Sequence, residues 1–251
     1  MKEKELKPCL LVFAGPNGSG KSTIKSMFEI KGKYTNADDV VASTGMDNLE
    51  AAKLVDEMRY ESIRNKEDFS FETVLSSDYK MNILRKAKEE GYFIKCVFVL
   101  TANPELNVYR VESRVSKGGH DVPADKIIDR YAKSLANIKE LIRLCDIMHV
   151  YDNTDKAVRI IRKHKDDISI FPNPFWNEED ILDLMVWYRI AGRNAGYFDV
   201  KIKFTLHLGL QFTFTLRSHY AHILCNDIQC IEYVYKNAWQ IMYNLMYNLI
   251  A

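Results

Sequence analysis

Long apolar runs are absent from this 251-residue chain, and so is a charge excess of either sign. No apolar segment approaches the length of a membrane span, and the opening residues, MKEKELKP, lack the apolar core of a signal peptide. Lysine and arginine total 35 against 34 aspartates and glutamates, so the composition offers no bulk attraction for nucleic acid or an acidic membrane. We therefore expect no nucleic-acid partner and no membrane partner.

Cysteine is scarce as well. The five cysteines are an odd number at irregular spacings, which indicates a reducing compartment rather than a disulfide framework. We therefore expect a cytoplasmic protein. The length is enough to bury a full core and predicts one domain with a small appendage.

The segment 15–23, GPNGSGKST, is the feature around which the chain is organised. It fits the pattern G-x-x-x-x-G-K-[ST], with an apolar strand-like segment before it and a helix-like segment after it. In this pattern the lysine reaches the β- and γ-phosphates of a nucleotide, and the following hydroxyl binds Mg²⁺. The predicted nucleotide-binding residues are Gly15, Pro16, Asn17, Gly18, Ser19, Gly20, Lys21, Ser22 and Thr23, with Ser22 as the Mg²⁺ ligand.

Apolar strand-like segments alternate with amphipathic helical segments from residue 10 to residue 151. Strands are predicted at 10–13, 34–37, 69–71, 92–100 and 147–151. Helices are predicted at 22–32, 49–65, 78–90, 104–116 and 124–144. This alternation predicts an α/β fold, a parallel sheet with helices on both faces, with ligands at the carboxyl ends of the strands.

The pattern changes beyond residue 151. Residues 159–171 favour a hairpin around Lys165-Asp166-Asp167, and Asn177 is expected to cap a helix that runs to about residue 190. Residues 201–216 alternate like antiparallel strands. We place a boundary near residue 192, with an extension at 193–251 to which no function is assigned.

Two acidic residues follow short predicted strands. Asp38 is our candidate for the base that deprotonates an attacking hydroxyl, and the alternative is that it only caps the helix beginning at Val40. Glu72 ends the next strand, where it could bind Mg²⁺ through water or hold a substrate hydroxyl. The alternative for Glu72 is a solvated carboxylate at a strand end.

Arginines flank a glycine-rich break at 117–123. Arg110 and Arg114 lie four residues apart on one helix face, and Arg130 follows the break. This arrangement is typical of a lid that brings arginines to a transferring phosphate, although surface salt bridges also explain such residues. His120 in the break is a weaker candidate for a ligand.

Two further patterns are better explained by ordinary structure. Residues 65–68, NKED, match a guanine-specificity motif but follow a charged helix rather than an apolar strand. In the tail, helical packing explains the spacing of a zinc-like set, which comprises His219, His222, Cys225 and Cys230.

Residues 9–190 resemble the zeta-toxin-like P-loop kinases, in particular the branch of predicted ATPases. The resemblance rests on motifs in register: AGPNGSGKST, NADD, FETVLS, RVESRVSKGGHDVP, SLAN and YDN. It implies a kinase domain at 1–192 that uses ATP or GTP with Mg²⁺. It also implies Asp38 as base, Lys21, Arg114 and Arg130 as phosphate-clamping residues, and a substrate pocket with Asp38, Glu72, Thr73 and Arg110.

Zeta toxins are similar to this chain and phosphorylate UDP-N-acetylglucosamine, and an antitoxin protein holds them inactive. The resemblance therefore implies a nucleotide-sugar substrate and an antitoxin partner, although the GGHDVP break departs from the toxins. Three alternatives stay open: a transporter-type ATPase, a nucleotide-gated binding module, and a kinase of another acceptor such as a nucleoside or polynucleotide end. A transporter-type ATPase requires an LSGGQ-like signature, and VLSSD at 74–78 lacks its glycines.

Overall fold

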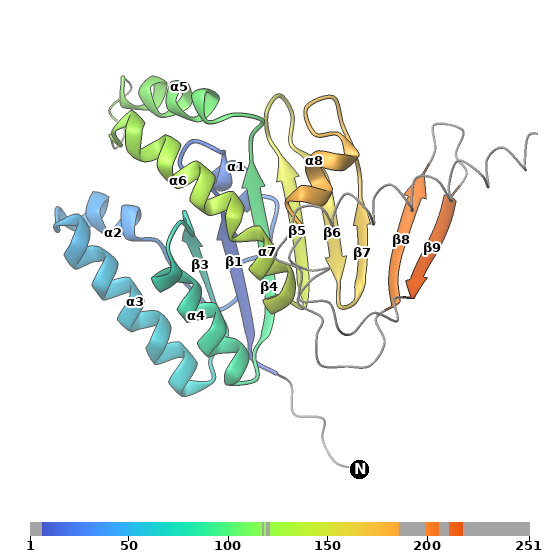
Figure 1. The fold of residues 1–251 in the computed structure, drawn as a ribbon. Coiled ribbons are helices and arrows are strands. Elements are labelled where there is room, and N and C mark those ends of the chain that lie inside the picture. Colours follow the sequence, from blue (N-terminus) through green and yellow to red (C-terminus); the bar gives the residue numbers. More distant parts are fainter. Residues whose placement is uncertain (1–6, 117, 119–120, 186–198, 206–210, 218–251) are drawn as a thin grey trace, which may run out of the picture.

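A mixed β-sheet forms the centre of the described chain (Figure 1). The computed structural model describes residues 7–116, 118, 121–185, 199–205 and 211–217. The strand order is β2-β3-β1-β4-β5-β6-β7-β8-β9, and neighbours from β2 to β5 run parallel. The strands are β1 (Cys9–Ala14), β2 (Lys33–Thr35), β3 (Phe69–Thr73), β4 (Phe93–Leu100), β5 (Ile147–Asp152), β6 (Val158–His164), β7 (Asp167–Ile170), β8 (Asp199–Thr205) and β9 (Gln211–Arg217).

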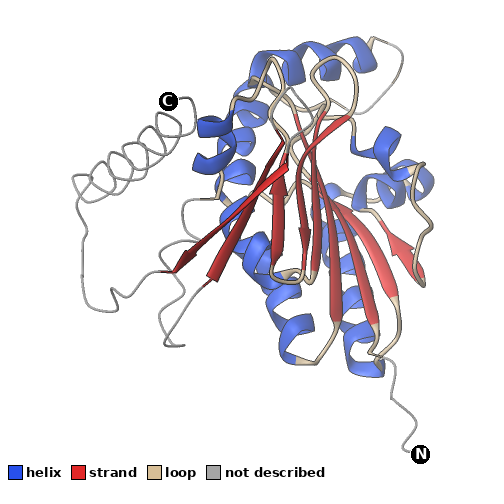
Figure 2. Ribbon diagram, turned by 90° about the vertical axis from the view of Figure 1, so that its right-hand side faces the viewer, coloured by secondary structure: helices blue, strands red, loops and turns tan. Residues whose placement is uncertain are grey.

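Helices cover both faces of this sheet, which confirms the predicted fold class (Figures 1 and 2). Helices α3, α4, α6 and α7 lie on one face, and α1 lies on the other. The helices are α1 (Lys21–Lys25), α2 (Ala37–Thr44), α3 (Asn48–Asn65), α4 (Asp78–Glu89), α5 (Pro104–Val115), α6 (Ala124–Ala136), α7 (Ile138–Leu144) and α8 (Glu178–Asp183).

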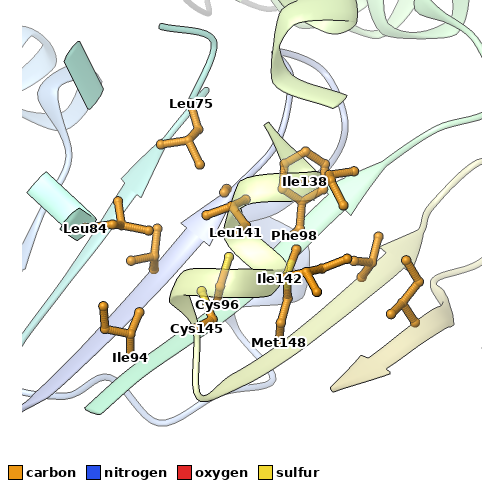
Figure 3. Packing of buried hydrophobic residues seen from close by; sticks show 14 of the residues in the cluster. Leu75, Leu84, Ile94, Cys96, Phe98, Ile138, Leu141, Ile142, Cys145 and Met148 are labelled. Carbon is orange, nitrogen blue, oxygen red and sulfur yellow. The ribbon is translucent and has the colours of Figure 1, made fainter. Parts of the chain in front are cut away.

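Strand β1 supplies side chains to a hydrophobic cluster on each face. Leu10 and Val12 pack in the larger cluster beneath α4 and α7, whereas Leu11 and Phe13 pack with Ile24 of α1. Figure 3 shows the larger cluster, with α7 lying over β4 and β5. Because successive side chains in a strand point to opposite faces, a strand covered on both faces is continuously apolar.

Two predicted helices are interrupted. The helix expected at 124–144 is two helices that meet at Asn137. The Asn137 N–H donates to the Ser134 carbonyl oxygen at 3.2 Å, three residues earlier, and its side-chain amide donates to the Leu75 carbonyl oxygen at 2.9 Å. The helix expected from residue 22 to 32 ends at Lys25. There Ser26 Oγ donates to the Thr23 carbonyl oxygen at 2.7 Å, and the next residues continue in tighter turns.

Antiparallel strands extend the sheet beyond β5. Strands β6 and β7 form the predicted hairpin, with Lys165 in the left-handed conformation at its turn. Asn177 caps α8 as predicted, but this helix ends at Asp183 and not near residue 190. Strands β8 and β9 pair antiparallel, while the proposed boundary at 192 and the zinc-like set lie outside the described residues. Among the described residues, none of the helices combines the length and apolar character that crossing a membrane requires.

Candidate nucleotide and phosphoryl-transfer site

The glycine-rich loop joins β1 to α1 at the carboxyl edge of the parallel strands. Strand β1 lies between β3 and β4, so the loop occupies the point where the chain's connections diverge to the two sides of the sheet. Gly15 has φ 139°, and a Cβ there would lie 2.0 Å from the Val99 carbonyl oxygen. Gly20 has φ 91°, and its Cβ would lie 2.2 Å from Asn153 Nδ2. This backbone therefore requires glycine at both positions.

Lys21 lies inside the curl of this loop. Its Nζ donates to the carbonyl oxygens of Gly15 at 2.8 Å and Pro16 at 3.0 Å, and the residue is only 8% exposed. The Ser19 hydroxyl is buried without a hydrogen-bond partner in the described chain. A buried ammonium and an unpaired hydroxyl beneath a loop with a helix amino terminus provide what a polyphosphate needs.

Polar side chains from α5 and α6 brace the loop at Asn17. Asn107 Nδ2 donates to the Asn17 carbonyl oxygen at 2.7 Å, and Arg130 Nη1 donates to the Asn17 side-chain oxygen at 3.5 Å. Asn107 is fully buried and also contacts Thr101 Oγ1. Asn107 is not among the residues predicted for the site, although its position four residues before Val111, on the apolar face of an amphipathic helix, is a signal that could have identified it.

A second brace comes from the segment that follows β5. Asn153 Nδ2 donates to the Ser19 carbonyl oxygen at 2.8 Å. Arg110 in turn donates to the carbonyl oxygens of Asn153 and Thr154, both at 2.9 Å. Arg110 thus fixes the segment that holds the phosphate loop, and its role in binding substrate stays a prediction.

Glu72, at the end of β3, accepts hydrogen bonds from two hydroxyl groups. Its Oε1 accepts from Ser22 Oγ at 3.5 Å, and its Oε2 accepts from the Tyr34 hydroxyl at 3.1 Å. Lys25 Nζ lies 3.7 Å from Glu72 Oε2 and donates to the Tyr34 oxygen at 2.8 Å. Burial, reinforced by Glu72, raises the pKa of Tyr34, so this phenol remains protonated and a donor.

Asp38 lies in the first turn of α2. The cap of this helix is Asn36, whose side-chain oxygen accepts from the Asp38 N–H at 3.2 Å. The alternative role of Asp38 as the cap of this helix is therefore wrong, and Asp38 is exposed. Because β2 pairs with β3, the start of α2 lies at the same edge of the sheet as Glu72.

Electrostatic effects on Lys21 connect these groups. Burial lowers the pKa of Lys21, the charges of Glu72 and Asp38 raise it, and the charge of Arg114 lowers it. All three therefore lie within electrostatic range of the Lys21 ammonium. The structure brings one lysine, two carboxylates and one arginine to a single edge of the sheet.

The remaining predicted residues lie around this edge. Thr73 ends β3, where its Oγ1 accepts from the Leu75 N–H at 3.2 Å. The break between α5 and α6 includes His120, which lies outside the described residues. Within the described residues, no group of three or more His, Cys, Asp or Glu side chains could hold a metal ion. The Ser22 hydroxyl and the Glu72 carboxylate lie together, and their oxygen atoms are of the ligand type that suits a magnesium ion bound to nucleotide phosphates.

The chain is thus an α/β protein whose glycine-rich loop follows the central strand of its parallel sheet. A sequence model of the zeta toxin family matches residues 37–165, which is 129 of the 251 residues. The chain belongs to the zeta toxin family. An uncharacterized protein of Haemophilus influenzae is 25% identical to it over 127 residues, which cover 48% of this chain and 91% of that protein.

Solved structures with related folds are more distant. A chain from the PezAT toxin–antitoxin system of Streptococcus pneumoniae has a TM-score of 0.45 and 18% identity, covering 62% of this chain and 73% of that one. A chain of the Pnkp1/Rnl/Hen1 RNA repair complex has a TM-score of 0.43 and 21% identity, covering 53% of this chain and 45% of that one. Both TM-scores lie below 0.5, and neither likeness bears on activity.

Proposed function

We propose that this chain is a phosphotransferase that moves the γ-phosphate of ATP or GTP to a hydroxyl of a nucleotide sugar such as UDP-N-acetylglucosamine. Membership of the zeta toxin family supports the reaction class. The observation that carries the proposal is the buried ammonium of Lys21 inside the glycine-rich loop, with the Glu72 carboxylate hydrogen-bonded to the neighbouring Ser22.

In this proposal Lys21 moves from the loop carbonyls onto the β- and γ-phosphates, because phosphate oxygens are stronger acceptors than the carbonyls it contacts without ligand. Asp38 accepts the proton of the attacking hydroxyl, and Arg114 and Arg130 neutralise charge that develops on the transferring phosphate. Bound Mg²⁺, with Ser22 as its ligand, supplies further charge neutralisation on the phosphates. Glu72, Thr73 and Arg110 complete the substrate side of the site.

The proposal includes an inhibitory partner chain, because the family is named for a toxin. An antitoxin that blocks the phosphate site would keep such an enzyme inactive. Expression of this chain alone in a bacterial host is expected to arrest growth, and Lys21→Ala is expected to remove the arrest. Equal growth with the wild type and Lys21→Ala would contradict a toxic role and leave the phosphotransferase proposal to the assay below.

The direct test incubates purified chain with Mg²⁺, UDP-N-acetylglucosamine and γ-labelled ATP or GTP. Asp38→Asn is expected to lower transfer by about 10²–10⁴-fold, the usual contribution of a general base, with nucleotide still bound. Lys21→Ala is expected to abolish transfer. The matched control is Asp39→Asn, because Asp39 is the exposed neighbour of Asp38 in the same helical turn.

Labelled nucleotide sugar that depends on Asp38 but not Asp39 supports the proposal in full. Label transferred instead to a nucleoside or a polynucleotide end retains the reaction class and replaces the acceptor. Full transfer in Asp38→Asn contradicts the base assignment. Tight nucleotide binding with no transfer to any acceptor contradicts the phosphotransferase and favours a binding module.

A further inference from the structure

A buried arginine on α3 connects β3, which contains Glu72, to β2, which leads into the helix that contains Asp38. Arg59 is 2% exposed, and its guanidinium lies 4.3 Å from the centre of the Phe71 ring. It lies outside the phosphate loop, and none of the roles proposed above uses it. Burying a charge is costly unless its hydrogen bonds are satisfied, so the partners of this guanidinium indicate its role.

Two of these partners are backbone carbonyl groups at strand ends. Arg59 Nη2 donates to the carbonyl oxygen of Thr35 at 3.3 Å and to that of Glu72 at 3.5 Å, and Nε donates to Thr35 Oγ1 at 2.9 Å. The β2–β3 ladder ends at the pair Thr35 and Phe71. Arg59 therefore continues the connection between the strands where their own pairing stops.

The carboxylate of Asp56 holds the other side of the guanidinium. Arg59 Nη1 donates to Asp56 Oδ1 at 2.9 Å, one turn earlier on α3. Lys80 of α4 lies 2.7 Å from Asp56 Oδ2, so two cations share this buried carboxylate. Burial lowers the pKa of Arg59, and Asp56 opposes that effect. The Asp56 carboxylate therefore fixes the direction in which the guanidinium points.

We propose that Arg59 is a positioning residue that sets the separation of Asp38 and Glu72 by tying together the carboxyl ends of β2 and β3. The expected effect of Arg59 on catalysis rests on the proposed function, whereas its effect on the positions of the strand ends does not. Asp38 is three residues beyond Thr35, and Asn36 between them caps α2, so the Thr35 backbone determines where that helix starts. Glu72 is held through its own carbonyl group.

The chemistry requires arginine rather than another cation. Three nitrogens of a planar fork serve separate acceptors, and a lysine ammonium is a single point that cannot reach all of them. A buried ion pair adds little net stability compared with apolar packing, so stability alone does not account for the arrangement. Precise placement of the two strand ends does account for the arrangement.

The test compares Arg59→Lys and Arg59→Met with Arg64→Met, in the full chain. Arg64 lies on the same helix and pairs with Glu57, but its side chain is 61% exposed. In Arg59→Lys, we expect kcat to fall by about 10²-fold, the effect of displacing a catalytic group by about 1 Å. The dissociation constant of a fluorescent ATP analogue should be unchanged, because the loop that binds phosphate is untouched.

Hydrogen–deuterium exchange tests the same inference without requiring activity. In Arg59→Lys, peptides covering 33–40 and 69–75 should exchange faster than in the wild type, while those of β1 and β4 should not. Unchanged exchange in both segments overturns the inference, as does parallel loss of kcat and nucleotide affinity, which indicates general destabilisation. A wild type that transfers phosphate to no acceptor contradicts the proposed function instead, and the exchange result then decides the role of Arg59.

Discussion

At the scale of single residues, the Glu72 carboxylate is held in place by its neighbours. A hydrogen-bonded chain runs from the Lys25 ammonium to the Tyr34 phenol and on to Glu72 Oε2. The other oxygen, Oε1, faces the Ser22 hydroxyl. A carboxylate with one oxygen fixed presents the other in a defined direction, which is the requirement for a group that must bind metal or substrate without reorganising.

Tyr34→Phe should weaken this arrangement without disturbing the fold. It removes the two hydrogen bonds that the phenol makes, one accepted from Lys25 and one donated to Glu72. Loss of the bond to the Glu72 carboxylate, worth about 1.5 kcal/mol, should raise the Mg²⁺ concentration for half-maximal transfer by about tenfold. The measurement is a Mg²⁺ titration of the transfer rate at saturating nucleotide. Tyr109→Phe is the matched control, because Tyr109 is 68% exposed. An unchanged Mg²⁺ requirement in Tyr34→Phe would show that the phenol does not orient Glu72.

At the scale of elements, side chains at helix ends join α3 to α4. Helix α3 begins after Asp47, whose carboxylate accepts from the Leu49 N–H at 2.8 Å, and ends at Asn65, followed by the cap residue Lys66 in the left-handed conformation. Lys66 Nζ then lies 2.6 Å from Glu90 Oε2, and Lys86 Nζ lies 3.0 Å from Glu90 Oε1. The carboxyl-terminal ends of two neighbouring helices are thereby linked through one carboxylate.

This link predicts a pH dependence at the acid side. Hydrogen bonds from Lys66 and Lys86 lower the pKa of Glu90 to about 2. Because the pKa in the folded chain lies below the ordinary 4.5, the contribution to stability is complete above that value. This contribution to stability is lost as the pH falls toward 2, where Glu90 becomes protonated in the folded chain as well. In Lys66→Met the pKa of Glu90 should rise toward its ordinary value, as measured by an NMR titration of the side-chain carboxyl.

The control for this titration is Arg64→Met, because Arg64 pairs with Glu57 at the same end of α3. The pKa of Glu90 should not change in that variant. A Glu90 pKa near 4.5 in the wild type would show that the two lysines do not hold the carboxylate in solution.

At the scale of the whole molecule, stability depends on the sheet and the helices of its larger cluster. Strand β4 lies between β1 and β5, and its inward side chains are buried beneath α7 (Figure 3). Phe98 is 0% exposed and packs among Ile138, Leu141 and Met148. Loss of its ring would leave a cavity that rigid neighbours on both sides cannot close.

Phe98→Ala should therefore lower the free energy of unfolding by about 3–5 kcal/mol. Phe98→Leu, which nearly conserves volume, should cost less than about 1.5 kcal/mol. Urea denaturation followed by circular dichroism measures both values, with Tyr109→Ala as the exposed control. Equal midpoints for Phe98→Ala and Tyr109→Ala would contradict a core role for Phe98.

Local patterns were sufficient for much of this architecture. Continuous apolar character identified β1 and β4, because strands covered on both faces have no polar side. The glycines of the phosphate loop were equally informative, since the left-handed backbone at Gly20 tolerates few other residues. The split of the helix at Asn137 was not predictable from local pattern, and the Asn137 side chain there bonds to Leu75, which lies far away in sequence.

The sequence by itself determined the α/β class, the glycine-rich loop and the family, because each depends on local spacing. The class follows from strand and helix patterns that alternate along residues 10–151, and the loop and the family follow from short motifs. Only the tertiary structure decided how the site is assembled. Separate elements supply the residues around it: the Glu72 partners Tyr34 and Lys25, the residue Asn153 that bonds to the loop, and the buried Arg59. Parallel strand pairing brings β1, β2 and β3 side by side, and the contacts among their carboxyl ends exist only once that pairing has formed.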